Sequence, residues 1–167
     1  MLTESLNALN PDSRIWLFTA DRTIKDEEKS LLLEECQQFL GQWAAHGSEL
    51  KAAADLIDGH LLIIAADESF QMASGCSIDS AVRFVKDLGQ KFNIDFFDRT
   101  KLLFKPKGEI KSIKLNELST QIAEGNISPE TPFYNTNITS LKELKSSLIV
   151  KAEESWLKRY FKAIESV

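Results

Sequence analysis

The sequence predicts an α+β fold, because short apolar segments of strand type alternate with longer segments of amphipathic helical type. Their order is strand, helix, strand, strand, helix, strand, which is the split βαβ core of ferredoxin-like folds. Right-handed crossovers give such a sheet the strand order 4-1-3-2. The first and third predicted strands are apolar on both faces, as central strands are, and the other two are half-polar, as edge strands are.

The first half of this core follows from one strand and one helical stripe. The strand is Ile15-Trp16-Leu17-Phe18, which is followed by Thr23 as the expected N-cap of a helix. Gly47 is a typical residue to stop that helix. The apolar stripe between the two recurs at spacings of three and four and consists of Leu32, Cys36, Phe39, Leu40 and Trp43.

A hairpin, a second helix and a fourth strand complete the predicted core. Asp58-Gly59 lies between a half-exposed strand, Leu50–Leu56, and an apolar strand, Leu61–Ala66. This pair of turn residues is typical of a type I′ hairpin. The second helix is expected to begin at a Ser77 cap and to end at Gly89. The fourth strand is Leu102–Phe104, which lysines flank.

The rest of the chain is expected to cover the open face of the sheet, which is too apolar to face water. It predicts a strand at 109–115, a short helix at 116–124, a loop at 128–132, a helix opened by the capping-box spacing of Ser140 and Glu143, and an amphipathic terminal helix. The terminal stripe of Trp156, Leu157, Tyr160, Phe161 and Ile164 is expected to pack on the protein's own core. We therefore predict one domain over 1–167, with a ferredoxin-like core at 10–106 and a C-terminal extension at 107–167.

Composition and charge exclude several classes of protein. Hydrophobic residues make up 43% of the 167 residues and charged residues 27%, as in globular proteins. No apolar run is long enough for a membrane span, and the first residues lack the features of an export signal. With two cysteines, these features predict a cytoplasmic protein with free thiols. The net charge of -5 argues against a nucleic-acid partner, although lysines cluster between Lys101 and Lys114.

The motifs of several large enzyme classes are missing from the sequence. It has no P-loop, no Gly-x-Gly-x-x-Gly, no His-Glu-x-x-His, no Cys-x-x-Cys and no Gly-x-Ser-x-Gly. Two histidines and two distant cysteines also lack the spacing of zinc ligands. We therefore predict no cofactor and no metal site.

One segment combines residues that suit a binding or catalytic site. Ser74-Gly75-Cys76-Ser77-Ile78-Asp79-Ser80 places a cysteine where the second helix begins. Backbone N–H groups and the positive end of the helix dipole favour a thiolate or a bound anion there. In a split βαβ unit the first helix ends where the second begins, so His46 is expected beside Cys76, near Asp67 and Glu68. Cys36, in the apolar stripe, is expected to be an inert core thiol.

Several interpretations of this segment remain open. Ser74, Gly75, Ser77 and Asp79 would contact a small anionic ligand or a protein partner, or the serines would only cap the helix. Cys76 and His46 would be the catalytic pair of a thiol-dependent hydrolase or transferase. A third class is a structural module that forms a homodimer through its sheet or its terminal helix.

A second candidate site is expected at the opposite end of the sheet. Asp21-Arg22-Thr23 follows the first strand and Asp98-Arg99-Thr100 precedes the fourth, and these strands are neighbours in the 4-1-3-2 order. Reciprocal salt bridges between the two tripeptides are the simplest arrangement. Arg22, Asp98 and Arg99 would otherwise clamp a carboxylate or phosphate of a ligand.

Several of these motifs resemble those of a family of small bacterial proteins whose function is not established. The similar segments are Gln42–Gly47, Ser74–Ser80, Phe96–Thr100 and Glu154–Leu157, so the resemblance spans most of the chain. Such proteins are often labelled "ABC transporter ATPase". This chain lacks both the P-loop and the Leu-Ser-Gly-Gly-Gln signature, so we expect no ATPase activity and no tight ATP binding.

Overall fold

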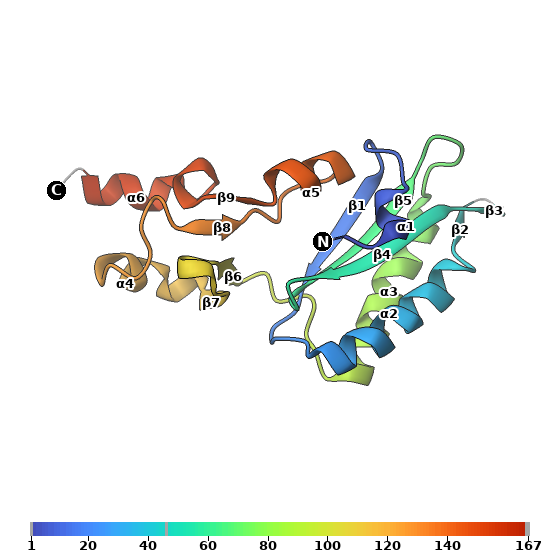
Figure 1. Ribbon diagram of the computed structural model, residues 1–167, viewed down its shortest axis with the longest axis horizontal. Helices are drawn as coiled ribbons and strands as arrows, with labels where there is room; N and C mark the ends of the chain where they lie inside the picture. Colours follow the sequence, from blue (N-terminus) through green and yellow to red (C-terminus); the bar gives the residue numbers. More distant parts are fainter. Residues whose placement is uncertain (1, 46, 166–167) are drawn as a thin grey trace. The chain divides into compact units, whose positions relative to one another are not determined.

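The chain folds as two compact units of α+β structure. The structure, a computed structural model, describes residues 2–45 and 47–165, with side chains as far as residue 162 (Figure 1). The first unit contains the residues up to Asp98 together with Thr139–Lys142, and the second contains Arg99–Ile138 and the residues from Glu143 onward. The predicted α+β class is confirmed.

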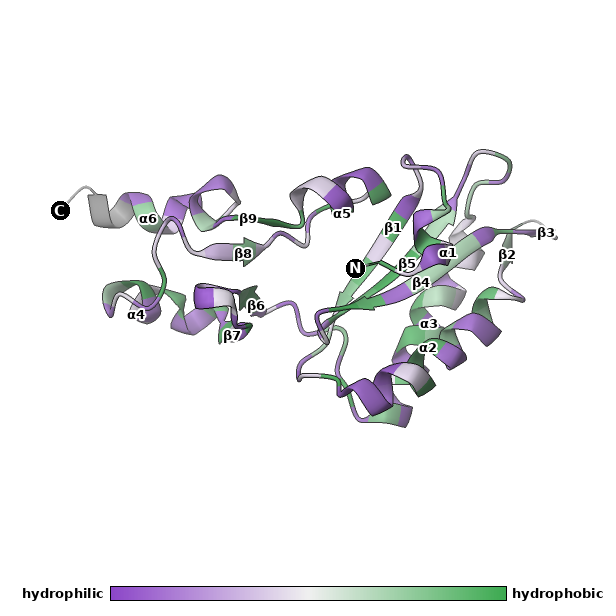
Figure 2. Cartoon of the chain, in the orientation of Figure 1, coloured by the Kyte–Doolittle hydropathy of each residue, from purple (hydrophilic) through white to green (hydrophobic). Residues whose placement is uncertain are grey.

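A three-stranded antiparallel sheet in the order β1-β5-β4 forms the centre of the first unit. The strands are β1 (Arg14–Thr19), β4 (Lys51–Ile57) and β5 (Leu61–Asp67). Every residue of β5 is buried, and Figure 2 colours this strand hydrophobic over most of its length. The predicted pairing of the second strand with the third, and of the third with the first, is therefore confirmed.

The turn between β4 and β5 has the predicted type I′ backbone. Asp58 and Gly59 both have positive φ, 52° and 68°, and the N–H of His60 donates to the carbonyl of Ile57 at 3.1 Å. Glycine suits the second of these positions because a residue without a Cβ adopts positive φ without strain.

The predicted fourth strand is not part of this sheet, so the 4-1-3-2 order is wrong at that position. That strand, β6 (Lys101–Phe104), pairs with β7 (Lys111–Lys114) in a separate sheet. A hairpin partner only a few residues away closes a much shorter loop than pairing with β1 requires. The edge of β1 instead receives a short contact in which Ile15 N–H donates to the carbonyl of Thr139 at 3.0 Å.

Two helices cover one face of the sheet, as Figure 1 shows. They are α2 (Asp26–Leu40) and α3 (Gly75–Phe92), and their apolar sides form one core with the sheet. The central residues of this core are Leu32, Cys36, Leu40, Ala54, Leu56, Leu62, Ile64, Ala81, Val85 and Leu88.

The ends of α2 differ from the prediction. The helix begins after Lys25, not after Thr23, because Glu28 Oε2 accepts the backbone N–H of Lys25 at 3.0 Å and so caps the first turn. It ends at Leu40 rather than near Gly47. Trp43 still joins the core, but it leads into a small hairpin of β2 (Ala44–Ala45) and β3 (Ser48–Glu49).

The ends of α3 were also misplaced by the sequence pattern. Ser74, not Ser77, is the N-cap, and the helix continues past Gly89 to Asn93, which ends it with a left-handed φ of 56°. Gly89 has a different role, because a Cβ at this position would lie 2.4 Å from the carbonyl oxygen of Ile94. The glycine therefore permits the returning chain to pack directly against the helix.

The other face of the sheet is also buried, at Ile15, Ala53 and Ile63 among others. A short helix that the sequence did not predict, α1 (Glu4–Asn7), lies against β4. Asp55 Oδ2, on this face, accepts the backbone N–H of Thr3 at 2.9 Å and so fastens the segment. Covering of this face by the C-terminal extension stays a prediction.

The second unit has its own four-stranded antiparallel sheet, in the order β7-β6-β8-β9. The strands β8 (Pro132–Tyr134) and β9 (Ile149–Lys151) are too short to give a pattern and were not predicted. Its helices are α4 (Leu118–Ala123), α6 (Lys158–Glu165) and α5 (Leu141–Ser147), although the first two residues of α5 belong to the first unit. Single 3₁₀ turns occupy Pro106–Gly108, Leu115–Glu117 and Ala152–Glu154. Leu157 and Phe161 join the core of this unit as predicted.

In the part of the chain that the structure describes, no helix has both the length and the apolar character that crossing a membrane requires.

Candidate functional site

The predicted cysteine site lies where α3 begins, and its serines form a closed cap. Ser74 Oγ accepts the N–H of Ser77 at 3.1 Å, and Ser77 Oγ accepts the N–H of Ser74 at 2.6 Å. The indole N–H of Trp43 donates to the carbonyl of Ser77 at 2.8 Å and joins the start of the helix to the core. Ser74 and Ser77 are therefore committed to holding the helix end in place.

Cys76 remains accessible above this cap. Its side chain is exposed, as are Gly75 and Asp79. The backbone N–H groups of Gly75 and Cys76 donate to no acceptor among the described residues, as the first N–H groups of a helix commonly do not. The exposure expected of a reactive thiol is present at this position.

The loop that leads into α3 is held by its own acidic residues. Asp67 Oδ1 accepts both the N–H and the hydroxyl of Ser69, at 3.0 and 2.5 Å, and Glu68 Oε2 accepts the N–H of Ala73 at 2.8 Å. The hydrogen bonds from Ser69 lower the pKa of Asp67. Both carboxylates that were expected beside the thiol are thus engaged in loop structure.

The same loop presents two large apolar side chains to solvent. Phe70 is 94% exposed and Met72 is 65% exposed. They follow the buried strand β5 and precede the Ser74 cap, so the loop carries them at the same end of the unit as Cys76. The sequence analysis missed these residues, although apolar side chains within a long polar connection were a signal that could have indicated them.

The proposed Cys–His pair is not assembled by the described residues. His46 lies outside the described part of the chain. The other histidine, His60, directly precedes β5, whereas Cys76 follows the far end of that strand, a separation of about 20 Å along a strand of this length. His60 is buried, with Nδ1 3.0 Å from the carbonyl of Asp58 and Nε2 3.3 Å from the hydroxyl of Thr23.

Cys36 lies in the core, as the sequence predicted. It is fully buried in the core of the first unit, and burial raises the pKa of its thiol to about 12.

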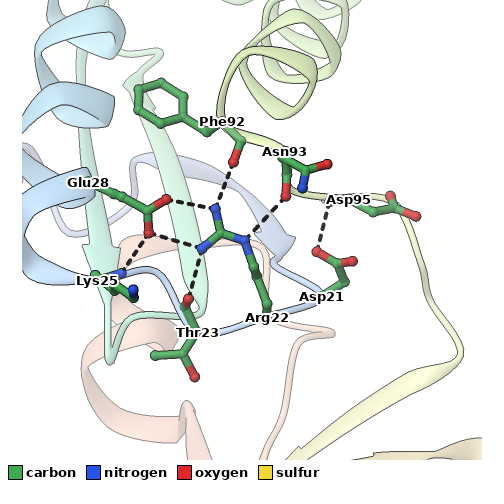
Figure 3. A network of polar contacts seen from close by, with 8 residues as sticks. All are labelled: Asp21, Arg22, Thr23, Lys25, Glu28, Phe92, Asn93 and Asp95. Atoms are coloured by element: carbon green, nitrogen blue, oxygen red, sulfur yellow. Dashed lines mark hydrogen bonds and ion pairs between the residues drawn. The ribbon is translucent and has the colours of Figure 1, made fainter.

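At the opposite end of α3, Arg22 joins two helices in the network that Figure 3 shows. Its Nη1 and Nη2 donate to the two carboxylate oxygens of Glu28, near the start of α2, at 2.9 and 2.7 Å. Its Nη2 and Nε also donate to the carbonyls of Phe92 and Asn93, at the end of α3, at 2.7 and 3.2 Å. A further bond from Nη1 reaches the carbonyl of Thr23 at 3.1 Å.

These bonds engage all five N–H groups of the guanidinium, so Arg22 has none to offer to a ligand anion. The interpretation of Arg22 as part of a ligand clamp is therefore wrong, and the expected bridge to the second tripeptide is replaced by the pair with Glu28. The hydrogen bonds from Arg22 lower the pKa of Glu28 to about 2. The positive charge also suits the carbonyl end of α3, where the helix dipole is negative.

The second tripeptide, Asp98-Arg99-Thr100, is divided between the two units. Asp98 is the last residue of the first unit and is half-buried, whereas Arg99 begins the second unit and is exposed. Asp21 is bonded to the returning chain, since its Oδ1 accepts the N–H of Asp95 at 2.8 Å. Arg22 therefore does not form the Asp–Arg bridge that was expected of it, and its partners come from the ends of the two helices.

Metal ligation finds no support among the described residues, which include no cluster of three or more His, Cys, Asp or Glu side chains able to hold an ion.

In comparisons with known proteins, no family model, curated protein or solved structure matches the chain. The resemblance to the small bacterial family therefore stays a prediction. The geometry defines the chain as an α+β protein of two units, in which Phe70, Met72 and Cys76 are exposed at the same end of the first unit.

Proposed function

We propose that the protein is a binding module whose contact surface is the Glu68–Cys76 segment, and that its partner is another protein. The observation that carries this proposal is the exposure of Phe70, at 94%. A phenylalanine buries a large apolar area when it is covered, so leaving it in water forgoes a favourable free energy that a partner would recover. Met72 adds a flexible apolar side chain of the kind that adapts to a partner's surface.

The loop is ordered by its own contacts, which lowers the cost of binding. The carboxylates of Asp67 and Glu68 fasten its two ends, and the Ser74 cap fixes its junction with α3. A contact segment that is already held in place loses less conformational entropy when a partner covers it.

Charge indicates the kind of partner. The segment 61–82 contains Asp67, Glu68 and Asp79 but no lysine or arginine. A partner surface that presents basic side chains around an apolar pocket would complement it. We therefore expect an apolar and basic segment of a protein.

A selection of displayed peptides on the purified protein tests this proposal. Peptides enriched on the wild type should combine apolar residues with Lys or Arg, and a Phe70→Ser/Met72→Ser variant should lose them. Leu31→Ser is the matched control, because Leu31 is 58% exposed but lies on α2, away from the loop. Enrichment of the same peptides by the double variant, or of none by the wild type, contradicts the proposal.

A small anionic ligand is the second candidate, and the free N–H groups of Gly75 and Cys76 favour it. Glu68 and Asp79 oppose it, because they bring negative charge to the same end of the helix. Titration with phosphate, followed by amide NMR shifts, distinguishes the two. Saturable shifts confined to residues 74–78 would support the anion site, and unchanged shifts would exclude it for phosphate.

Thiol catalysis remains a proposal that one substitution tests. Cys76→Ser removes the nucleophile while leaving the cap of Ser74 and Ser77 intact. If peptide binding survives this change, the surface acts by contact and not through thiol chemistry.

A further inference from the structure

A hollow of about 390 Å³ lies at the carbonyl end of α3, where the chain returns along the helix over residues 93–97. This volume falls in the range of small-molecule sites. Its apolar part comes from Val85, Ile94 and Phe96, which are buried. Its polar lining includes Lys86, Gln90, Asn93 and Asp95.

Lys86 and Asp95 carry opposite charges at this hollow but do not pair with each other. In the part of the chain that the structure describes, no ion pair joins Lys86 to Asp95, whereas Arg22 pairs with Glu28 and Lys91 with Glu35. Each of these two charges can therefore pair with an opposite charge of a ligand that enters the hollow.

Local contacts hold each of these groups in place. The ammonium of Lys86 lies over the ring of Phe97, 5.6 Å from its centroid, and that ring packs edge-on against Phe18 with centroids 5.7 Å apart. Asp95 Oδ1 accepts the backbone N–H of Phe97 at 2.8 Å, which leaves its second oxygen for another donor. The N–H of Asp95 donates to Asp21, as Figure 3 shows.

We infer that this hollow binds a small zwitterion of the α-amino-acid class with an apolar side chain. The ligand's ammonium pairs with Asp95, close to the carbonyl end of α3, where the helix dipole favours a cation. Its carboxylate pairs with Lys86, and its side chain lies against Phe97 and the apolar wall. A simple anion suits the hollow less, because Asp21 and Asp95 both line it.

Three small probes separate the parts of this inference, which is independent of the proposed function. L-phenylalanine carries both charges, phenethylamine lacks the carboxylate, and 3-phenylpropionate lacks the ammonium. Amide NMR titration should give saturable shifts at residues 85–97 with L-phenylalanine. Each fragment should bind about tenfold more weakly, because each loses one charge-assisted hydrogen bond.

Variants of the exposed charges provide the decisive comparison. Lys86→Gln and Asp95→Asn should each weaken L-phenylalanine binding about tenfold. Arg83→Gln and Asp87→Asn, which change exposed charges on α3 outside the hollow, should leave it unchanged. Thermal unfolding confirms that each variant is folded. Absence of saturable shifts up to about 10 mM, fragments that bind as well as the amino acid, or binding that survives both hollow variants overturns the inference.

Discussion

The two ends of α3 are held by different kinds of polar group and differ in what they leave exposed. At the Ser74 end, backbone and hydroxyl groups cap the helix among themselves, and Phe70, Met72 and Cys76 remain exposed. At the Asn93 end, every N–H group of Arg22 is engaged with Glu28 or with carbonyls. The comparison teaches that a charged motif can be structural, while the loop at the other end of the same helix carries the exposed side chains.

The largest expected difference concerns the two cysteines. Burial raises the pKa of Cys36 from 9.0 to about 12, which lowers its thiolate fraction at neutral pH about thousandfold, whereas Cys76 is exposed. Because Cys36 is also shielded by the core, iodoacetamide should label Cys76 orders of magnitude faster than Cys36. Mass spectrometry of timed digests measures both rates, and Cys76→Ser should abolish the fast phase. Equal rates would show that the helix end opens readily or that Cys36 is not shielded.

The next largest expected difference is in the stability lost when a glycine near each end of α3 is replaced by alanine. Gly89→Ala places a Cβ 2.4 Å from the carbonyl oxygen of Ile94, so backbone must shift, at a cost of about 3 kcal/mol. Gly75→Ala at the other end meets no atom within 4 Å and should change stability by less than about 0.5 kcal/mol. Urea unfolding of both variants gives the two values, and a similar loss in each would contradict the contrast.

Removal of Arg22 should have a smaller but clear effect. Arg22→Ala leaves the carbonyls of Phe92 and Asn93 without this donor and breaks the pair with Glu28. Because the side chain is 35% exposed, water replaces part of the loss, and we expect about 1–2 kcal/mol by urea unfolding. Lys91→Ala is the control, since its pair with Glu35 is at the surface and should contribute less than about 0.5 kcal/mol. A loss no larger than that of the control would mean that the network does not stabilise the helix ends.

The smallest expected effect is the pH dependence that the Arg22–Glu28 ion pair gives to the free energy of unfolding. The pKa of Glu28 is lowered from 4.5 to about 2, so its contribution is fully present above pH 4.5 and is lost as the pH falls toward 2. The difference in stability between wild type and Glu28→Gln should therefore narrow over that window. Thermal unfolding at a series of pH values measures it. A difference that stays constant down to pH 2 would show that the carboxylate charge does not matter.

Local patterns carried much of the information about the first unit. The Asp58-Gly59 pair determined its own positive φ values, and the run Leu61–Ala66 indicated a strand buried on both faces. Such features depend on a few adjacent residues, so they can be derived without the rest of the fold. Helix ends were harder, because Glu28, three residues inside α2, decided where that helix begins.

The place of Cys76 at the start of α3 could be predicted from the sequence, but the partners of the other candidate residues could not. Exposure of Cys76 and burial of Cys36 both follow from their places in the helices. The role of Arg22 could not be derived, since its partners at residues 28 and 92–93 meet only when both helices pack on the sheet. Phe70 and Met72 stand in a long polar connection, which is a signal in the sequence, but only the packed core, which is complete without them, established their exposure.

By itself, the sequence determined the α+β class, the order β1-β5-β4 and the thiol that lies where α3 begins, because periodicity, turn chemistry and short-range handedness act locally. Tertiary structure alone decided that β6 pairs with β7 and not with β1, and that Arg22 bonds to both Glu28 and the end of α3. It also decided that the chain after α3 packs directly against Gly89. Those outcomes depend on which distant groups compete for the same edge, donor or space, and the competition is settled only when the whole chain packs.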